Sequence, residues 1–138
     1  MEAVTYVLDL PRSASFYSQV LGLVVRESGD GYCVMDGSGG TLTLVRVPED
    51  LAVGIDLADP PERREQTPIK LIFPVTDIAG TRALALSFGG VIDPVGAEWH
   101  WQGTVRCDGQ DPEGNVLQVS CPVTKTHNSS IPQSRSST

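Results

Sequence analysis

The alternation of apolar and polar residues predicts a strand and then a helix at the start of the chain. Residues 2–8 alternate loosely, which is typical of a strand with two different faces. The next segment carries apolar residues at helical spacing and predicts a helix over about residues 10–21. Two pairs of residues spaced four apart form one apolar stripe along that helix: Phe16 with Val20, and Tyr17 with Leu21.

Residues that favour helix termini mark both ends of this helix. Asp9 is placed to cap the first turn, in which Pro11 is tolerated because an N–H at that position would have no partner. Gly22 supplies the left-handed residue that commonly ends a helix. The Gly-rich segments that follow predict hairpins between three further strands, at residues 23–27, 32–35 and 41–47.

The same order of elements is predicted again after a polar connection at residues 49–67, which has room for one helical turn. A strand at residues 69–75 leads into a helix at residues 77–88, with Asp77 at its start and Gly89 as its stop. The helix residues expected to face inward are Ile78, Thr81, Leu84, Ala85 and Phe88. Strands are then expected at about residues 90–93, 98–107 and 115–121.

An internal repeat relates the two halves of the chain. Asp77 lies 68 residues after Asp9, and the turn-rich run at residues 36–42 is echoed at residues 111–117. We therefore predict an α+β fold of two βαβββ modules that form a curled eight-stranded mixed sheet, an open barrel enclosing a cleft. The modules pair either within one chain or with a second chain. The expected divisions are module 1 at residues 1–48, a linker at 49–67, module 2 at 68–122 and a Ser-rich tail at 123–138.

Composition limits the cellular setting and the partners. The net charge of −7 disfavours nucleic acid, which attracts a basic face, and permits a cationic ligand. No apolar run is long enough for a membrane span, and the first residues lack the basic region of a signal peptide. We therefore expect a cytoplasmic protein whose three cysteines are free thiols. We also expect a homodimer, because open sheet edges are normally covered.

Two motifs resemble those of a known superfamily. They are Val7-x-Asp9-x-x-x-Ser13-x-x-Phe16-Tyr17-x-x-x-Leu21-Gly22-Leu23 and Asp111-Pro112-Glu113-Gly114-Asn115. This pattern is similar to the vicinal oxygen chelate superfamily, which includes glyoxalases, bleomycin-resistance proteins and extradiol dioxygenases. The resemblance covers about residues 2–122. It implies the paired-module fold but not one activity, because lyases, dioxygenases, epimerases, transferases and drug-binding proteins share this scaffold.

The resemblance also implies four positions at which metal-binding members hold a divalent cation, on the first and last strand of each module. In this sequence these positions fall at Glu2, Thr43, Lys70 and Gln118. Metal-binding members usually have histidine at the third position and glutamate at the fourth. Only Glu2 is a good ligand, and the ammonium of Lys70 would repel a cation. We therefore expect no metal and no other cofactor, and an ion pair between Lys70 and Glu2 in place of the cation.

A second group of candidate residues lies near residue 100. In a strand, Trp99 and Trp101 share one face and His100 the other. The tryptophans are either core or dimer contacts, or a stacking wall for a planar or cationic ligand. Arg106 either binds a carboxylate or pairs with Glu98. The candidate ligand-binding residues of the cleft are Glu2, Tyr6, Thr43, Lys70, Trp99, Trp101, Arg106 and Gln118.

Two functions of different classes follow from these residues. The first is a metal-free, non-catalytic protein of the glyoxalase/bleomycin-resistance type that sequesters a small organic ligand, aromatic or cationic, in the cleft. The alternative is an enzyme of the same superfamily, a lyase, isomerase or dioxygenase-like protein that uses Glu2 as a base or an atypical metal site. A third possibility is a vestigial cleft in a protein that acts as an assembly part. The missing metal ligands and the paired tryptophans favour the binding protein.

Overall fold

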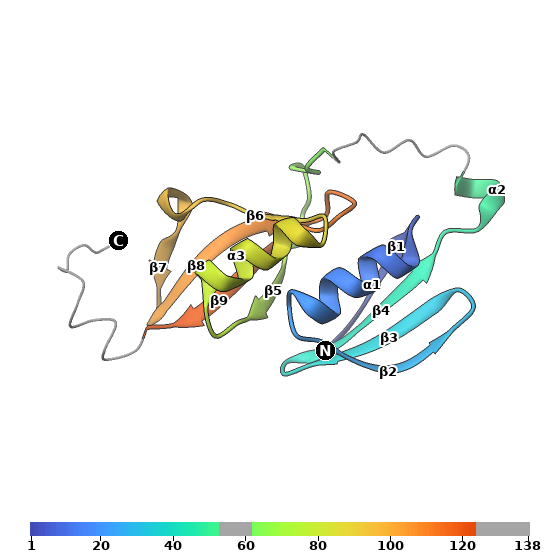
Figure 1. Ribbon diagram of the computed structural model, residues 1–138, viewed down its shortest axis with the longest axis horizontal. Helices are drawn as coiled ribbons and strands as arrows, with labels where there is room; N and C mark the ends of the chain where they lie inside the picture. Colours follow the sequence, from blue (N-terminus) through green and yellow to red (C-terminus); the bar gives the residue numbers. More distant parts are fainter. Residues whose placement is uncertain (53–61, 124–138) are drawn as a thin grey trace.

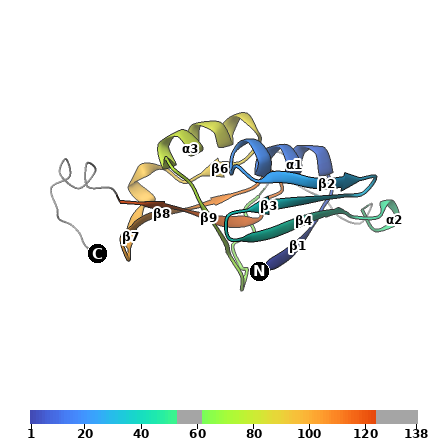
Figure 2. The ribbon, with the colours of Figure 1, turned by 90° about the horizontal axis from the view of Figure 1, so that it is seen from below.

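The computed structural model describes residues 1–52 and 62–123, which form two β-sheets with a helix across each (Figure 1). Part of the predicted linker, residues 53–61, and the tail from residue 124 lie outside the described residues. Both long helices lie on the same side of the two sheets, so each sheet has one face without a helix (Figure 2). We call the side of each sheet that carries no long helix its helix-free face, and the other side its helix-covered face.

The first sheet has the strand order β1-β4-β3-β2. Its strands are β1 (Glu2–Val7), β2 (Val24–Gly29), β3 (Tyr32–Gly37) and β4 (Gly40–Arg46), and the long helix is α1 (Leu10–Gln19). The strand β1 runs parallel to β4, whereas the other pairs are antiparallel. A short helix, α2 (Glu49–Ala52), provides the helical turn for which the sequence left room.

The second sheet has the strand order β5-β9-β8-β6, and a further strand, β7, pairs with β8. Its elements are β5 (Leu71–Pro74), α3 (Ile78–Ser87), β6 (Val91–Ile92), the 3₁₀ helix η1 (Val95–Ala97), β7 (Trp99–Trp101), β8 (Thr104–Gln110) and β9 (Val116–Pro122). The α+β fold of two such modules is confirmed: the described residues form two sheets of four and five strands, which do not close into a barrel. The expected single strand at 98–107 is wrong. It is a hairpin whose turn residues Gln102 and Gly103 both have positive φ, at 48° and 77°.

The predicted helix signals are mostly confirmed. The carboxylate of Asp9 accepts a hydrogen bond from the backbone N–H of Arg12 at 3.1 Å, as a capping residue does. Asp77 also precedes its helix, but its side chain makes no capping hydrogen bond. The glycines that end the two helices, Gly22 and Gly89, have φ values of 76° and 88°. Leu84, expected to face inward on α3, is exposed.

The core lies between the helices and the sheets and continues across both modules. It includes the fully buried Phe16 of α1, Leu44 of the first sheet and Val119 of the second. Gly90 permits this close packing, because a Cβ there would lie only 2.3 Å from the Phe16 ring. Among the described residues, no helix is long and apolar enough to cross a membrane. Cys33, Cys107 and Cys121 are all free thiols, as expected.

The two motifs that carried the resemblance contact each other and join the modules. The Tyr17 hydroxyl of α1 donates to the fully buried carboxylate of Asp111 at 2.7 Å. The carboxylate of Glu113 accepts from the backbone N–H groups of Leu8, at 2.9 and 3.0 Å, and Asp9, at 2.8 Å. Burial, and then the charge of Asp111, raise the pKa of Tyr17 well above its ordinary value. The motifs therefore serve the assembly of the fold.

Candidate functional site

The strand register places five of the eight candidate residues on the helix-free face of the second sheet. Buried Cys107, Leu117 and Val119 belong to the core and mark the helix-covered face. Since neighbouring residues on a strand point to opposite faces, Arg106 and Gln118 lie on the helix-free face. Trp99 is the cross-strand partner of Arg106, and Trp101 is the partner of Thr104, so both tryptophans lie there too. Lys70 precedes β5 at the opposite edge of the sheet, and it is on the same face because its side chain binds Asp108 of β8.

A row of hydrogen bonds crosses this face from β5 to β8. The Lys70 ammonium donates to Asp108 Oδ2 at 3.0 Å, and the Gln118 amide donates to Asp108 Oδ1 at 3.2 Å. Arg106 donates from Nη1 to the Gln118 carbonyl oxygen at 3.0 Å and from Nε to the Thr104 hydroxyl at 3.0 Å. The row holds Arg106 in place through neutral acceptors, so that its charge is positioned without being neutralised.

The tryptophans are not core residues, because Trp99 is 38% exposed and Trp101 is 53% exposed. Arg106 does not pair with Glu98 either. Glu98 forms an ion pair with Arg82 at 2.6 Å instead. In the described part of the chain, no carboxylate forms an ion pair with Arg106.

The other three candidate residues lie on the helix-free face of the first sheet. Thr43 is the cross-strand partner of Val4, and Glu2 and Tyr6 share the face of β1 that Val4 occupies. Tyr6 is 67% exposed. Next to this group, Arg26 binds Asp36 through two hydrogen bonds of 3.0 and 2.8 Å, which lower the pKa of that carboxyl group. The structure thus divides the candidate residues between two sheets.

The expected ion pair between Lys70 and Glu2 is not formed, because Lys70 pairs with Asp108 at 3.0 Å. The side chains of this pair are 36% and 28% exposed, so solvent screens the attraction and the pair contributes less than about 1 kcal/mol to stability. Asp108 was missed from the sequence. The signal was its spacing of two residues from Arg106 along a strand, which places both side chains on one face.

The residues at the four positions do not fit a divalent metal. Lys70 brings a positive charge, and both ends of the Gln118 amide are engaged, by Arg106 and Asp108. Thr43 offers one weak hydroxyl ligand, which leaves Glu2 as the strong donor. Among residues 1–52 and 62–123, no three side chains of His, Cys, Asp or Glu gather closely enough to hold a metal ion.

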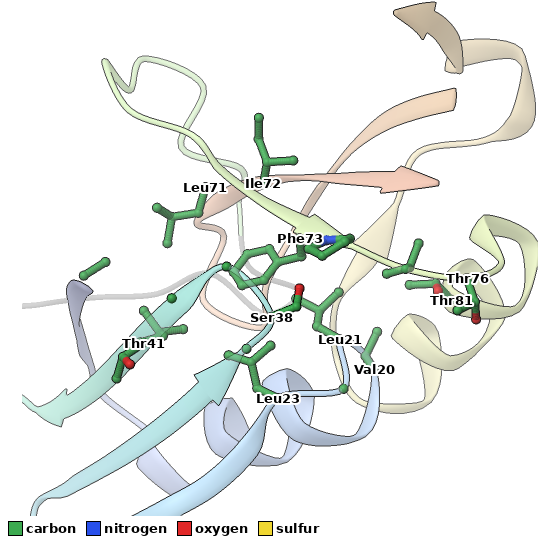
Figure 3. A pocket seen from close by; sticks show the side chains of 18 of the residues that line it. Val20, Leu21, Leu23, Ser38, Thr41, Leu71, Ile72, Phe73, Thr76 and Thr81 are labelled. Atoms are coloured by element: carbon green, nitrogen blue, oxygen red, sulfur yellow. The ribbon is translucent and has the colours of Figure 1, made fainter. Parts of the chain in front are cut away.

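A cavity of about 830 Å³ opens between the modules, away from most of these residues (Figure 3). Its lining is largely apolar and includes Leu21 and Leu23 after α1, and Ile72 and Phe73 of β5. Of the eight candidate residues, Glu2 and Lys70 line it. Exposed Leu84 of α3 also borders the cavity, which explains why an apolar residue predicted to be inward is left uncovered.

Comparisons with known proteins agree on one fold. A family model described as a glyoxalase-like domain matches residues 2–120. A search of curated protein sequences gives no match.

Three solved structures share the fold. The fosfomycin resistance protein FosX from Listeria monocytogenes, solved with Mn(II) and sulfate ion, has a TM-score of 0.63 at 10% identity, covering 94% of each chain. The bleomycin-binding protein from Streptomyces verticillus, solved with copper(II)-bleomycin, has a TM-score of 0.52 at 17% identity, covering 88% of this chain and 93% of that one. A glyoxalase/bleomycin resistance protein from Albidiferax ferrireducens T118 has a TM-score of 0.59 at 18% identity, with coverage of 87% and 95%.

Proposed function

Because the chain belongs to the glyoxalase-like domain family, a branch of the vicinal oxygen chelate superfamily, we propose that it is a metal-free binding protein that sequesters a small organic ligand. The ligand is bound on the helix-free faces of the sheets. One observation carries the proposal: at two of the four positions that the superfamily resemblance implies for metal ligands, Lys70 is in an ion pair with Asp108 and Gln118 is hydrogen-bonded at both ends.

This arrangement opposes metal binding in two ways. A cation near Lys70 would be repelled by the ammonium group, and it would have to compete with that group for Asp108. The Gln118 carbonyl oxygen would also have to give up its hydrogen bond from Arg106 before it could act as a ligand. A catalytic metal site needs about three suitable protein donors. Even with this row of hydrogen bonds broken, the side chains at the four positions would be a weak set of metal ligands.

The test is elemental analysis and calorimetry of the chain incubated with Zn²⁺, Ni²⁺, Mn²⁺ or Fe²⁺. The unmodified protein should hold no stoichiometric metal. The double variant Lys70→His with Gln118→Glu should begin to bind Zn²⁺ or Ni²⁺, because it adds an imidazole and a carboxylate beside Asp108. As a control, Arg46→His with Gln19→Glu adds the same groups at exposed positions and should gain no site. One tightly bound metal per unmodified chain would overturn the proposal.

We also propose that the protein is a homodimer in which the second chain covers the cavity between the modules. Apolar Met1, Ile72 and Leu84 border the cavity and are exposed in one chain. The strands β1 and β5 each have one neighbour in their sheets, so each presents an edge for further pairing. Light scattering should therefore give twice the chain mass, and Ile72→Glu should shift the mass toward one chain. A single-chain mass at high protein concentration would contradict this proposal.

The alternative function, an enzyme with Glu2 as its base, leads to a different result. Glu2 is exposed at the start of β1 and borders the cavity between the modules. Turnover of a bound compound that Glu2→Gln abolishes, with binding of that compound retained, would establish the enzyme in place of the binding protein.

A further inference from the structure

Within residues 1–52 and 62–123, Arg106 on the helix-free face of the second sheet has no negatively charged partner. Two nearby carboxylates on this face are each in an ion pair with another residue, Asp108 with Lys70 and Asp93 with Arg63. Glu98 lies toward the helix-covered side, in an ion pair with Arg82 of α3. Arg106 is held instead by two neutral oxygen atoms, those of Thr104 and Gln118. A partly buried cation positioned in this way favours an anionic partner.

The Arg106 guanidinium also keeps free donors. A guanidinium has five N–H groups in a rigid fork that matches the two oxygen atoms of a carboxylate. In the described part of the chain, two of them are used, one from Nε and one from Nη1. Three remain for a ligand. Since the hydrogen bonds to Thr104 and Gln118 already fix the side chain, little conformational entropy is lost when an anion binds.

Two exposed tryptophans lie on β7, the strand next to this cation on one side. Trp99 is the cross-strand partner of Arg106, which places their Cβ atoms about 4.5–5.5 Å apart. Trp101 is the partner of Thr104, the residue whose hydroxyl group accepts from Arg106. Two residues along a strand are separated by about 6.6 Å, which is close to the length of two fused aromatic rings. The rings and the guanidinium together offer an apolar surface beside a carboxylate-binding group.

We propose that this face binds a planar aromatic carboxylate of about two fused rings. Its carboxylate accepts hydrogen bonds from Arg106, and its rings contact Trp99 and Trp101. The inference rests on the proposed binding function and narrows the ligand from aromatic or cationic to aromatic and anionic. The net charge of −7 does not oppose it, because the charge within a few ångströms of the ligand is that of Arg106 and surface charge further away is screened by salt.

Three probes that differ in charge test the proposal: 2-naphthoate, 2-naphthylmethanol and 2-naphthylmethylamine. Isothermal titration calorimetry measures their binding, and the indole N–H signals in NMR spectra locate it. We expect 2-naphthoate to bind at least tenfold more tightly than the alcohol, with no detectable binding of the amine, and to shift both tryptophan signals. Arg106→Gln and Trp101→Ala should each weaken 2-naphthoate at least tenfold.

A matched control separates this site from a general effect of charge. Arg12→Gln removes an exposed arginine from α1, on the helix-covered side, and should change the affinity less than twofold. Tighter binding of the alcohol or the amine, equal effects of Arg106→Gln and Arg12→Gln, or no binding of 2-naphthoate at millimolar concentration would each overturn the inference. These results are distinct from failure of the proposed function, which is a stoichiometric metal in the unmodified chain.

Discussion

The hydrogen bond between Tyr17 of module 1 and Asp111 of module 2 helps to join the two modules. The substitution Tyr17→Phe tests how much this contact contributes to stability. The substitution removes one hydroxyl group and keeps the ring, so the contacts of that ring with Phe16 and Phe73, at centroid distances of 5.3 and 5.7 Å, are retained. What is lost is the hydrogen bond of 2.7 Å to Asp111. Tyr17 is 3% exposed and Asp111 is fully buried, so water cannot replace the missing donor.

The size of the effect follows from the other donors to Asp111. Its carboxylate also accepts from the backbone N–H groups of Glu113 and Asn115, at 2.8 and 3.0 Å, and from the Asn115 amide at 2.9 Å. The anion therefore stays partly satisfied after the change. A hydrogen bond to a charged group contributes about 1.5–3 kcal/mol. We expect Tyr17→Phe to lower the free energy of unfolding by about 2 kcal/mol at neutral pH.

Alkaline pH gives an independent check, because the pKa of Tyr17 is raised in the folded protein. Above the pKa of an unfolded tyrosine, about 10, the unfolded chain releases the Tyr17 proton while the folded chain keeps it. Stability from this group is therefore present below pH 10 and is lost as the pH rises toward the folded pKa, by about 1.4 kcal/mol per pH unit. The difference between the unmodified protein and Tyr17→Phe should shrink over that range.

The assay is urea unfolding followed by tryptophan fluorescence at pH 7 and at intervals above pH 10. Tyr32→Phe is the matched control, because Tyr32 also donates to a carboxylate, that of Glu27 at 2.7 Å, but at an exposed position. It should change stability far less at pH 7. If Tyr17→Phe costs less than about 0.5 kcal/mol, or no more than Tyr32→Phe, the buried hydrogen bond does not hold the modules together.

Three further changes test other parts of the structure, the first two by the same urea unfolding assay and the third by thermal unfolding. Glu113→Gln should cost about 2 kcal/mol, because the amide NH2 would replace the oxygen that accepts from Leu8 at 3.0 Å and the charge that strengthens all three bonds would be lost, whereas Glu49→Gln at the exposed start of α2 should be neutral; equal effects would contradict the role of Glu113. Lys70→Met should cost less than about 1 kcal/mol, because its ion pair with Asp108 is partly exposed, and a larger loss would mean a more buried pair. Gln102→Val should lower the melting temperature more than Gln102→Asn, because a β-branched residue is strained at a φ of 48°; equal melting temperatures would refute that strain.

The elements that were predicted correctly are those whose signals are local. The helical stripe, the capping carboxylate of Asp9 and the glycine at position 22 act within a few residues of one another, so the sequence pattern carries them. The hairpin between β7 and β8 was missed because its local sequence pattern is misleading. Residues 98–107 alternate as one strand would, and the first residue of its turn is Gln102, which is not a usual turn residue.

The candidate site was predicted as a set of positions but not as a set of contacts. Alternation along a strand was enough to place Trp99 and Trp101 on one face. Arg106 joins them only through the hairpin between β7 and β8, since in the predicted single strand it would lie on the opposite face. The partner of Lys70 was predicted wrongly, because it depends on which strand lies beside β5 and in what register. Cross-strand register is set by the packing of the whole sheet, and no local pattern in the chain encodes it.

The hydrogen bonds that tie the Asp111–Asn115 turn to Tyr17, Leu8 and Asp9 have an evolutionary consequence. They lie at the joint between the modules, whereas the residues proposed to meet a ligand project from the helix-free faces. Substitutions on the helix-free faces would leave these hydrogen bonds between the modules intact. The residues proposed to bind a ligand can therefore change during evolution without loss of the fold. The sequence motif by which this chain is assigned to its superfamily therefore describes how the two modules are joined, and it contains none of the residues proposed to bind a ligand.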